Sequence, residues 1–170
     1  GPNSSALLKA ADTSLYAAKD MGKNCLAFYE PELTRKAEHR FQVEEYLREA
    51  IDQQQISLVF QPQIDIASGE IIGVEALSRW HHPELGHISP LDFIPTAERI
   101  GMTKTLTEWV LKAACEQAVN WKKAGLPPIQ VAVNISPKHF LDPSIVPLIR
   151  RVVDQTGMVA SDLVLEITEG

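Results

Sequence analysis

Cysteine is scarce in this sequence, with only Cys25 and Cys115 among 170 residues. The two stand alone, without metal-ligand spacing and without the framework that a disulfide-stabilised domain requires. An apolar run long enough to span a bilayer and a recognisable signal peptide are also absent. These absences favour a reducing compartment, so we expect a cytoplasmic location for this part of the chain. A longer parent protein would be free to carry a sensor or membrane domain elsewhere.

Positively charged residues are fewer than negatively charged ones: the sequence has 16 Lys and Arg and 22 Asp and Glu, which give a formal net charge of -6. This balance argues against a general surface for nucleic acid polymers, which neutralises phosphates with many basic side chains. It permits a small phosphate ligand, which needs only local positive charge. With 45% apolar and 22% charged residues, the composition is that of a globular domain with a real core. Internal repeats and low-complexity tracts are absent from the sequence.

The chain starts with Gly-Pro-Asn-Ser and has no initiator methionine, which we interpret as a cloning remnant or an excised piece. Apolar residues at helical spacing predict a helix over 5–21, ended by Gly22, and the apolar run at 26–29 is a candidate edge strand. This segment is too small to bury a core of its own. A second predicted helix, over 31–53, begins with Pro31 and carries one apolar stripe, which indicates a helical connector.

From residue 56 onward, predicted strands alternate with predicted helices. The first two strands, 56–64 and 70–80, flank the turn signal Ser68-Gly69 and predict an antiparallel hairpin. A loop is expected over 81–89. The later elements are helices at 90–100, 103–124 and 144–155, strands at 129–135 and 162–168, and an irregular stretch from 136. This alternation predicts parallel strands with crossover helices, and therefore an α/β sheet or barrel.

Polar residues occur where three of these strands end, namely Glu75, Asn134 and Glu166. In α/β folds the carboxyl ends of strands gather functional residues at one rim, so we expect these three to converge. All three offer oxygen donors, which suits Mg²⁺ or Mn²⁺ and not structural zinc. The alternative is that each is an ordinary surface or turn residue, and spacing alone leaves both interpretations open.

Two further polar residues fit the same rim. Arg79 shares a strand face with Glu75, because side chains alternate along a strand. Its planar guanidinium suits a phosphate group. Gln61, near the end of the first strand, offers a donor and an acceptor to a base or a ribose. We expect His81 and His82 to be solvated in their loop.

The run Glu75-Ala76-Leu77-Ser78-Arg79-Trp80 resembles the signature of EAL domains, the bacterial cyclic-di-GMP phosphodiesterases. Residues 60–63, 80–98, 133–136 and 165–169 resemble the motifs that surround this signature in the family. The resemblance extends from about residue 56 to the last residue. It implies the N-terminal half of a modified TIM (β/α) barrel with an antiparallel first strand, preceded by two helices.

The front of the chain resembles a different family. Residues 11–19 and the run Gly22-Lys23-Asn24 resemble the last helix of a GGDEF (diguanylate cyclase) domain, which often precedes an EAL domain. The implied organisation is a cloning remnant plus a GGDEF tail over 1–29, a helical connector over 30–55, and a truncated EAL domain over 56–170. The cyclase loop and its metal ligands are missing from the sequence, so we expect no cyclase activity.

The resemblance to EAL domains also implies roles for individual residues. Glu75, Asn134 and Glu166 resemble the metal ligands of the family, for Mg²⁺ or Mn²⁺, with Glu75 and Glu166 as the catalytic pair. Gln61 and Arg79 resemble positions that contact the substrate. The implied reaction is hydrolysis of one phosphodiester of cyclic-di-GMP, which gives the linear dinucleotide pGpG.

The main departure from the family is length, because a TIM barrel needs roughly 250 residues. The later aspartates, lysine and glutamate of the family have no counterpart here, whereas Glu169 resembles a glutamate that stabilises a functional loop. We therefore expect the chain alone to be inactive. Its unpaired strand edges predict association as a homodimer. Two alternatives stay open: an EAL domain that binds cyclic-di-GMP as a receptor, and an interaction piece that dimerises through the helix over 31–53.

Overall fold

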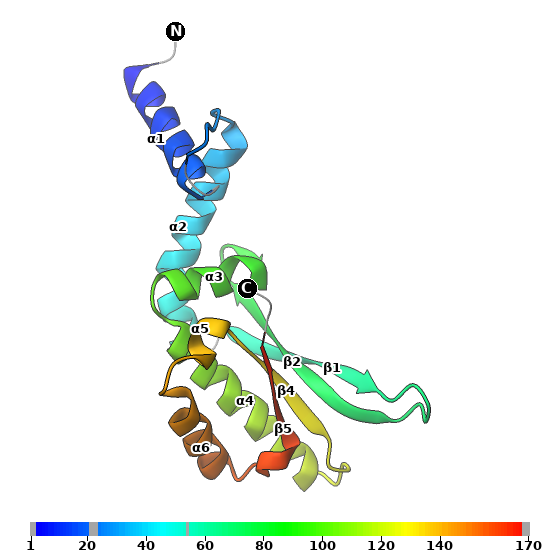
Figure 1. The fold of residues 1–170 in the computed structure, drawn as a ribbon. Helices are drawn as coiled ribbons and strands as arrows, with labels where there is room; N and C mark the ends of the chain where they lie inside the picture. The colour runs from blue at the N-terminus through cyan, green and yellow to red at the C-terminus, as the bar shows by residue number, and fades with distance from the viewer. Residues whose placement is uncertain (1–2, 21–23, 54, 168–170) are drawn as a thin grey trace. The chain divides into compact units, whose positions relative to one another are not determined.

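The computed structural model describes residues 3–20, 24–53 and 55–167, and the chain divides into two compact units, 1–46 and 47–170. Two helices account for most of the first unit: α1 (Ser4–Asp20) and the N-terminal part of α2 (Pro31–Asp52) (Figure 1). Both helices confirm the prediction from apolar spacing, whereas Gly22 lies outside the described residues. Within this unit, Lys9 Nζ lies 2.9 Å from Glu38 Oε1. Both side chains are exposed, so the ion pair adds little to stability.

The candidate edge strand at 26–29 is absent, and that prediction was wrong. The described residues of this run have no regular secondary structure, and Leu26 and Phe28 are 89% and 82% exposed. A strand is stabilised by hydrogen bonds to a neighbouring strand. The strands found in the described chain all lie beyond residue 55 and pair with one another.

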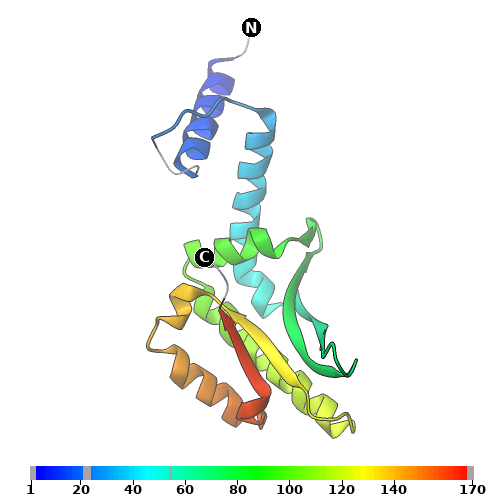
Figure 2. The same ribbon diagram turned by 45° about the vertical axis from the view of Figure 1, so that its right-hand side comes forward.

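The second unit contains a five-stranded sheet. Its strands are β1 (Ile56–Ile64), β2 (Ile71–His82), β3 (Gly86–Ile88), β4 (Gln130–Ile135) and β5 (Leu163–Ile167). The order is β1-β2-β4-β5, with β3 added to β2. The pair β1–β2 is antiparallel, whereas β2–β4 and β4–β5 are parallel (Figure 2). The predicted α/β sheet with an antiparallel first strand is therefore confirmed.

The turn between β1 and β2 is held by a short polar side chain. The Asp65 carboxylate accepts hydrogen bonds from the backbone N–H groups of Ala67 and Ser68, at 3.0 and 2.7 Å. Gly69 has a φ of 75°, which glycine adopts at low cost. These local contacts explain why the sequence signal for this turn was reliable.

The loop expected over 81–89 is a second hairpin instead. Strand β2 continues through His82, which pairs with Gly86 of β3. His82 is only 6% exposed, and its Nδ1 accepts hydrogen bonds from the backbone N–H groups of Glu84 and Leu85, both at 3.2 Å. The prediction of a solvated His82 was wrong, because the imidazole supplies the acceptor that this turn needs. His81 is exposed, as expected.

The helices of the second unit begin and end at recognisable residues. They are α3 (Pro90–Arg99), α4 (Thr103–Lys123), α5 (Pro137–Phe140), α6 (Ile145–Thr156) and the 3₁₀ turn η1 (Ala160–Asp162), in addition to the C-terminal part of α2. Ser89 caps α3 by accepting a hydrogen bond from the backbone N–H of Leu91 at 3.2 Å. The stretch expected to be irregular from 136 opens with α5, where the Ser136 hydroxyl accepts a hydrogen bond from the backbone N–H of His139 at 3.3 Å.

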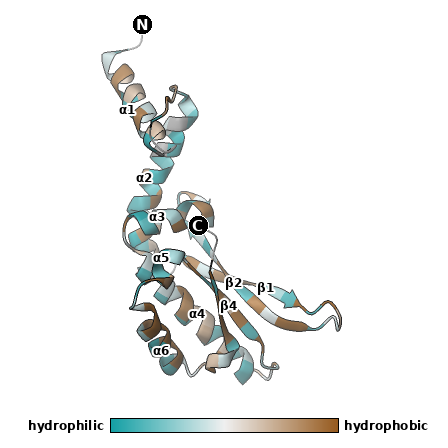
Figure 3. Ribbon diagram, viewed as in Figure 1, coloured by the Kyte–Doolittle hydropathy of each residue, from teal (hydrophilic) through white to brown (hydrophobic). Residues whose placement is uncertain are grey.

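Apolar side chains line the face of the sheet that α3 and α4 cover. Val131, Val133 and Ile135 of β4 are fully buried, and hydrophobic colours prevail along β4 in Figure 3. The ring of Phe60 on β1 meets that of Trp121 on α4 edge to face, with 4.8 Å between ring centroids. Side chains alternate along each strand, so the residues between these positions lie on the opposite face.

Candidate functional site

Most polar strand residues lie on the face of the sheet opposite α4. The register pairs Gln61 with Glu75 across β1 and β2, and Asn134 with Glu166 across β4 and β5. Glu75 in turn lies beside Ala132 of β4. We call this surface the polar face, and it is defined by Gln61, Gln63, Glu75, Arg79, Gln130, Asn134 and Glu166.

The shortest contact on the polar face joins Asn134 to Glu75. The Asn134 Nδ2 donates a hydrogen bond to Glu75 Oε1 at 2.7 Å, and both residues are half-buried. Hydrogen bonds to a charged acceptor are stronger than neutral ones. The contact therefore fixes the carboxylate and leaves Asn134 Oδ1 as an oxygen donor.

Glu166 lies next to this pair. It is the register partner of Asn134, which places the two backbones at the usual strand spacing of about 4.8 Å. Its Oε1 accepts a hydrogen bond from Gln63 Nε2 at 3.4 Å. Each of the two carboxylates on the polar face is thus held by one carboxamide.

The predicted ligand-contacting residues lie on either side of this group. Gln61 is exposed beside Glu75. Arg79 is four positions beyond Glu75 on β2, about 13 Å along the strand, and its Nη1 donates to the backbone carbonyl of Ser78 at 2.9 Å. Glu169 lies outside the described residues. The structure therefore brings Gln61, Glu75, Asn134 and Glu166 together and sets Arg79 further along the same face.

The donors that could hold a metal are Glu75, Asn134 and Glu166. They are hard oxygen donors on adjacent strands, a chemistry that fits Mg²⁺ or Mn²⁺. Within the described ranges, no cluster of three or more His, Cys, Asp or Glu side chains has the arrangement of a metal site. The candidate donor set is therefore two carboxylates, Glu75 and Glu166, and the amide of Asn134.

Gln63, like Gln130, is a polar-face residue to which sequence reasoning assigned no role. Alternation along β1 puts it on the same face as Gln61, which was a usable signal. Its contact with Glu166 joins β1 to β5 across a separation of 103 residues. Such a contact depends on the curvature of the whole sheet, which no local pattern encodes.

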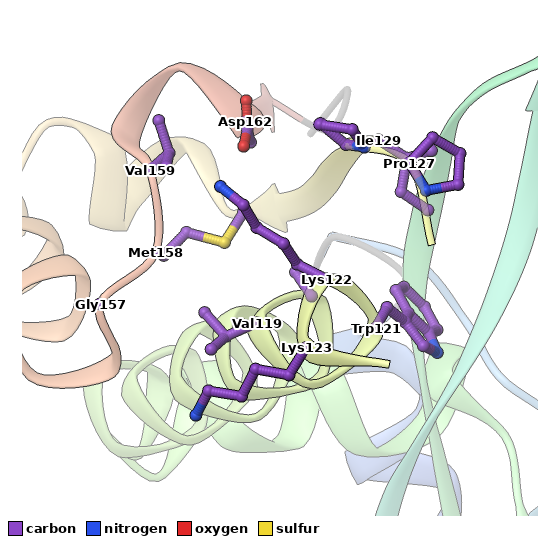
Figure 4. A pocket seen from close by; sticks show the side chains of 12 residues that line it. Val119, Trp121, Lys122, Lys123, Pro127, Ile129, Gly157, Met158, Val159 and Asp162 are labelled. Atoms are coloured by element: carbon purple, nitrogen blue, oxygen red, sulfur yellow. The ribbon is translucent and has the colours of Figure 1, made fainter. Parts of the chain in front are cut away.

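One cavity of the second unit lies away from the polar face. It measures about 330 Å³ and is formed by the segments that precede β4 and β5 together with the end of α4. In Figure 4, Lys122 points into it and Asp162 lies across from the Lys122 side chain. Amino-terminal strand ends in α/β barrels usually serve stability, whereas function lies at the carboxyl ends. We therefore place the candidate site on the polar face.

A buried histidine, His139, follows β4. His139 on α5 is 2% exposed, and its Nδ1 lies 3.0 Å from the Thr107 hydroxyl of α4. Burial lowers the pKa of His139 below its usual 6.5, while Asp142 opposes and Lys104 reinforces this shift. Its Nε2 has no hydrogen-bond partner among the described residues, so a proton there would be poorly accommodated.

We expect acid to destabilise the fold through this residue. Because the pKa of His139 is lowered in the folded chain, the unfolded chain binds a proton there more readily, so the free energy of unfolding falls as the pH is lowered below about 6.5. The loss attributable to His139 between pH 6.5 and 5.5 is at most about 1 kcal/mol, the limit for a histidine that stays neutral in the folded chain. Urea denaturation at both pH values measures it, with His139→Gln as the reference that cannot titrate. Equal pH dependence in both proteins would contradict the assignment.

In the described part of the chain, no helix combines the length and the apolarity that crossing a membrane needs.

Comparison with known proteins identifies relatives among bacterial signalling proteins. The chain is 40% identical over 169 residues to a signalling protein of Caulobacter vibrioides, covering 99% of this chain and 20% of the relative. It is 37% identical over 163 residues to the bifunctional diguanylate cyclase/cyclic di-GMP phosphodiesterase MucR of Pseudomonas aeruginosa, covering 96% of this chain and 24% of MucR. The chain thus spans about a quarter or less of the length of these relatives.

Solved structures agree with the sequence relatives. A complex of the PaMucR phosphodiesterase with c-di-GMP matches with a TM-score of 0.72 and 38% identity, over 76% of this chain and 52% of that one. The EAL domain of Xanthomonas citri FimX in complex with c-diGMP matches with a TM-score of 0.67 and 25% identity, over 80% and 52% of the two chains. Residues 44–170 match the EAL domain itself. The match over residues 44–170 and these relatives show that the chain belongs to the EAL domain family, in agreement with the five-stranded sheet and its antiparallel first strand.

Proposed function

We propose that this chain carries part of a metal-dependent site that binds cyclic-di-GMP and, in the whole protein, hydrolyses it to pGpG. The observation that carries the proposal is the 2.7 Å contact between Asn134 and Glu75 beside Glu166 on the polar face. The kinship to MucR, which is named as a cyclic di-GMP phosphodiesterase, supports the reaction. The structure of PaMucR with c-di-GMP supports the ligand.

Glu75, Asn134 and Glu166 would hold Mg²⁺ or Mn²⁺. When bound, the cation would supply Lewis-acid activation at the phosphodiester and a more acidic water. The protein residues orient the donors: Asn134 Nδ2 holds Glu75 and leaves Asn134 Oδ1 for the cation. Glu75 and Glu166 are the residues to which we assign catalytic roles.

Arg79 and Gln61 would hold the dinucleotide. Arg79 uses Nη1 on the Ser78 carbonyl, and a guanidinium has five N–H donors in all, so others remain for a phosphate oxygen. Gln61 is exposed beside Glu75 and can reach a ligand from solvent. Because Arg79 lies about 13 Å from Glu75 along β2, the two residues would contact different parts of an extended ligand.

The whole protein is proposed to carry more than this domain, since its relatives are much longer. Residues 1–29 are proposed as the tail of a GGDEF domain, a proposal that the double activity named for MucR supports. The boundaries 1–29, 30–55 and 56–170 stay predictions, as do a sensor or membrane domain in the parent, a cytoplasmic location for this part and the loop-stabilising role of Glu169. Homodimerisation through the edges of β1 and β5 is likewise a proposal.

Hydrolysis by the 170-residue chain alone is not expected. Two-metal hydrolysis of phosphodiesters uses paired cations about 3.5–4 Å apart. The described polar face offers two carboxylates and one amide near one another, which suffice for one cation. We propose that turnover needs donors that this chain does not supply.

The second candidate function is a receptor that binds cyclic-di-GMP without hydrolysing it. This alternative is favoured by the same set of two carboxylates and one amide. One cation held by that set, together with Arg79 and Gln61, would be sufficient to bind cyclic-di-GMP without hydrolysis. The likeness to the FimX EAL domain in complex with c-diGMP supports this alternative. Cation-dependent turnover by a longer parent protein would separate the phosphodiesterase from the receptor.

The test of the proposed function is calorimetric titration of this chain with cyclic-di-GMP in Mg²⁺, in Mn²⁺ and in EDTA. We expect binding that requires the cation and that weakens by about 10-fold or more in Arg79→Gln, because a phosphate contact is lost. Arg150→Gln on the exposed side of α6 is the matched control. Absence of binding in every condition would contradict the proposal. Light scattering on the same samples tests the homodimer, and pGpG production would overturn the expected inactivity.

A further inference from the structure

Gln63 and Glu166 lie on the two strands that are furthest apart along the path β1-β2-β4-β5. In a flat sheet, three strand spacings would separate β1 from β5 by about 14 Å. Yet Gln63 Nε2 lies 3.4 Å from Glu166 Oε1. The sheet therefore curves toward its polar face, and the Gln63 side chain reaches over the strands between.

The path of this side chain crosses β2 at Gly73. Gly73 is the register partner of Gln63 on one side and of Gln130 on the other. A Cβ added at Gly73 would come within 2.9 Å of Gln63 Oε1 and 3.1 Å of the backbone oxygen of Gln130. The first distance is shorter than real Cβ contacts allow, so any larger residue at Gly73 would displace the Gln63 carboxamide.

We propose that Gln63 is a positioning residue for Glu166, and that Gly73 keeps the space open through which Gln63 reaches it. The N–H of Gln63 holds one carboxylate oxygen of Glu166 and leaves the other free to face a cation. Asn134 does the same for Glu75. This inference rests on the proposed function, because the orientation of Glu166 matters there only if Glu166 binds a cation.

The neutral character of Gln63 is central to this role. A lysine or arginine would also hold the carboxylate, but its positive charge would repel a divalent cation bound a few ångströms away. A carboxamide donates a hydrogen bond without adding charge. The polar face thus uses two uncharged donors, Gln63 and Asn134, for its two carboxylates.

The contact itself is tested without metal by a double-mutant cycle. Gln63→Leu, Glu166→Leu and the double variant are compared by thermal unfolding in EDTA. We expect the shifts of the two single variants to be non-additive by about 2–4 °C, because each removes the same hydrogen bond. Gln130→Leu replaces the same side-chain type on the same face, and we expect its shift to add to that of Glu166→Leu.

The positioning role is tested by titration with Mn²⁺ alone, followed by calorimetry. We expect Gln63→Leu to weaken Mn²⁺ binding by about 10-fold, the lower end of the cost for losing an outer partner of a metal ligand. Gly73→Ala should weaken Mn²⁺ binding by a similar factor. The Gln63→Leu/Gly73→Ala double variant should bind Mn²⁺ no less tightly than the single variant with the lower affinity. Gln155→Leu, at an exposed glutamine of α6 away from the polar face, should bind Mn²⁺ like the parent chain.

The outcomes separate this inference from the function on which it rests. Additive shifts in the cycle would overturn the contact. Unchanged Mn²⁺ affinity in a folded Gln63→Leu variant would overturn the positioning role while leaving the proposed function intact. A parent chain that binds no Mn²⁺ would overturn the proposed function and, with it, the role of Gln63, whereas the cycle would still decide whether the two side chains interact.

Discussion

Replacing Glu75 with glutamine is expected to abolish most of the affinity of the chain for Mn²⁺. The substitution removes a negative charge from a proposed set of two carboxylates and one amide, while the glutamine oxygen still accepts the hydrogen bond from Asn134. Losing an outer partner of a metal ligand costs about 10- to 100-fold in affinity, so losing the charge of a ligand should cost at least about 100-fold. Because cyclic-di-GMP binding is proposed to need the cation, it should be lost in parallel.

The control for Glu75→Gln is Glu70→Gln. Glu70 is exposed in the turn of the β1–β2 hairpin, just before β2 begins, so the net charge changes equally and the polar face does not. Circular dichroism should show that both variants fold like the parent. If Glu75→Gln binds Mn²⁺ as tightly as Glu70→Gln does, Glu75 is not a metal ligand.

Replacing Trp80 with alanine is expected to cause the largest loss of stability among single substitutions in the second unit. Trp80 is fully buried, and its ring meets that of Phe93 edge to face at 5.8 Å. Its Nε1 also donates a hydrogen bond to Gln55 Oε1 at 3.2 Å. Removing a buried tryptophan costs about 3–5 kcal/mol, a large part of the roughly 5–15 kcal/mol that typically stabilises a domain.

Urea denaturation followed by circular dichroism measures this loss, and Trp121→Ala is the comparison. Trp121 is half-buried and contacts Phe60 at the edge of the core, so its truncation leaves a smaller cavity. We expect a clearly smaller decrease in the free energy of unfolding for Trp121→Ala. A larger decrease for Trp121→Ala than for Trp80→Ala would mean that the core is organised around α4 and β1 instead.

The parts of the fold that were predictable are those with a local cause. Ser68-Gly69 marks a turn because Asp65 and a positive φ close it within a few residues. Ser89 before Pro90 marks a helix start because the hydroxyl accepts a backbone N–H two residues on. His82 was misjudged because its partners are the N–H groups of a turn that the sequence did not signal.

The sequence predicted which residues belong to the candidate site but not the hydrogen bonds between them. Position at strand ends selected Glu75, Asn134 and Glu166, and alternation selected Arg79 and Gln61, but neither rule gives the pairing between side chains. The contact of Asn134 with Glu75 requires the order of the strands, and that of Gln63 with Glu166 requires the curvature of the sheet. The metal-binding and ligand-binding roles of these residues stay predictions until the titrations are done.

The sequence separation of these partners determines when each part of the site forms during synthesis. The β1–β2 hairpin that sets Gln61 beside Glu75 is a local element, and hairpins close in about 1–10 μs. Glu166 follows Gln63 by 103 residues, which a ribosome adds in roughly 5–20 s. During synthesis, Glu75 is therefore made seconds before Glu166. In that interval the edge of β2 that later pairs with β4 has no partner. Assembly of the polar face is a late event, and its rate is set by parallel pairing of distant strands rather than by the hairpin.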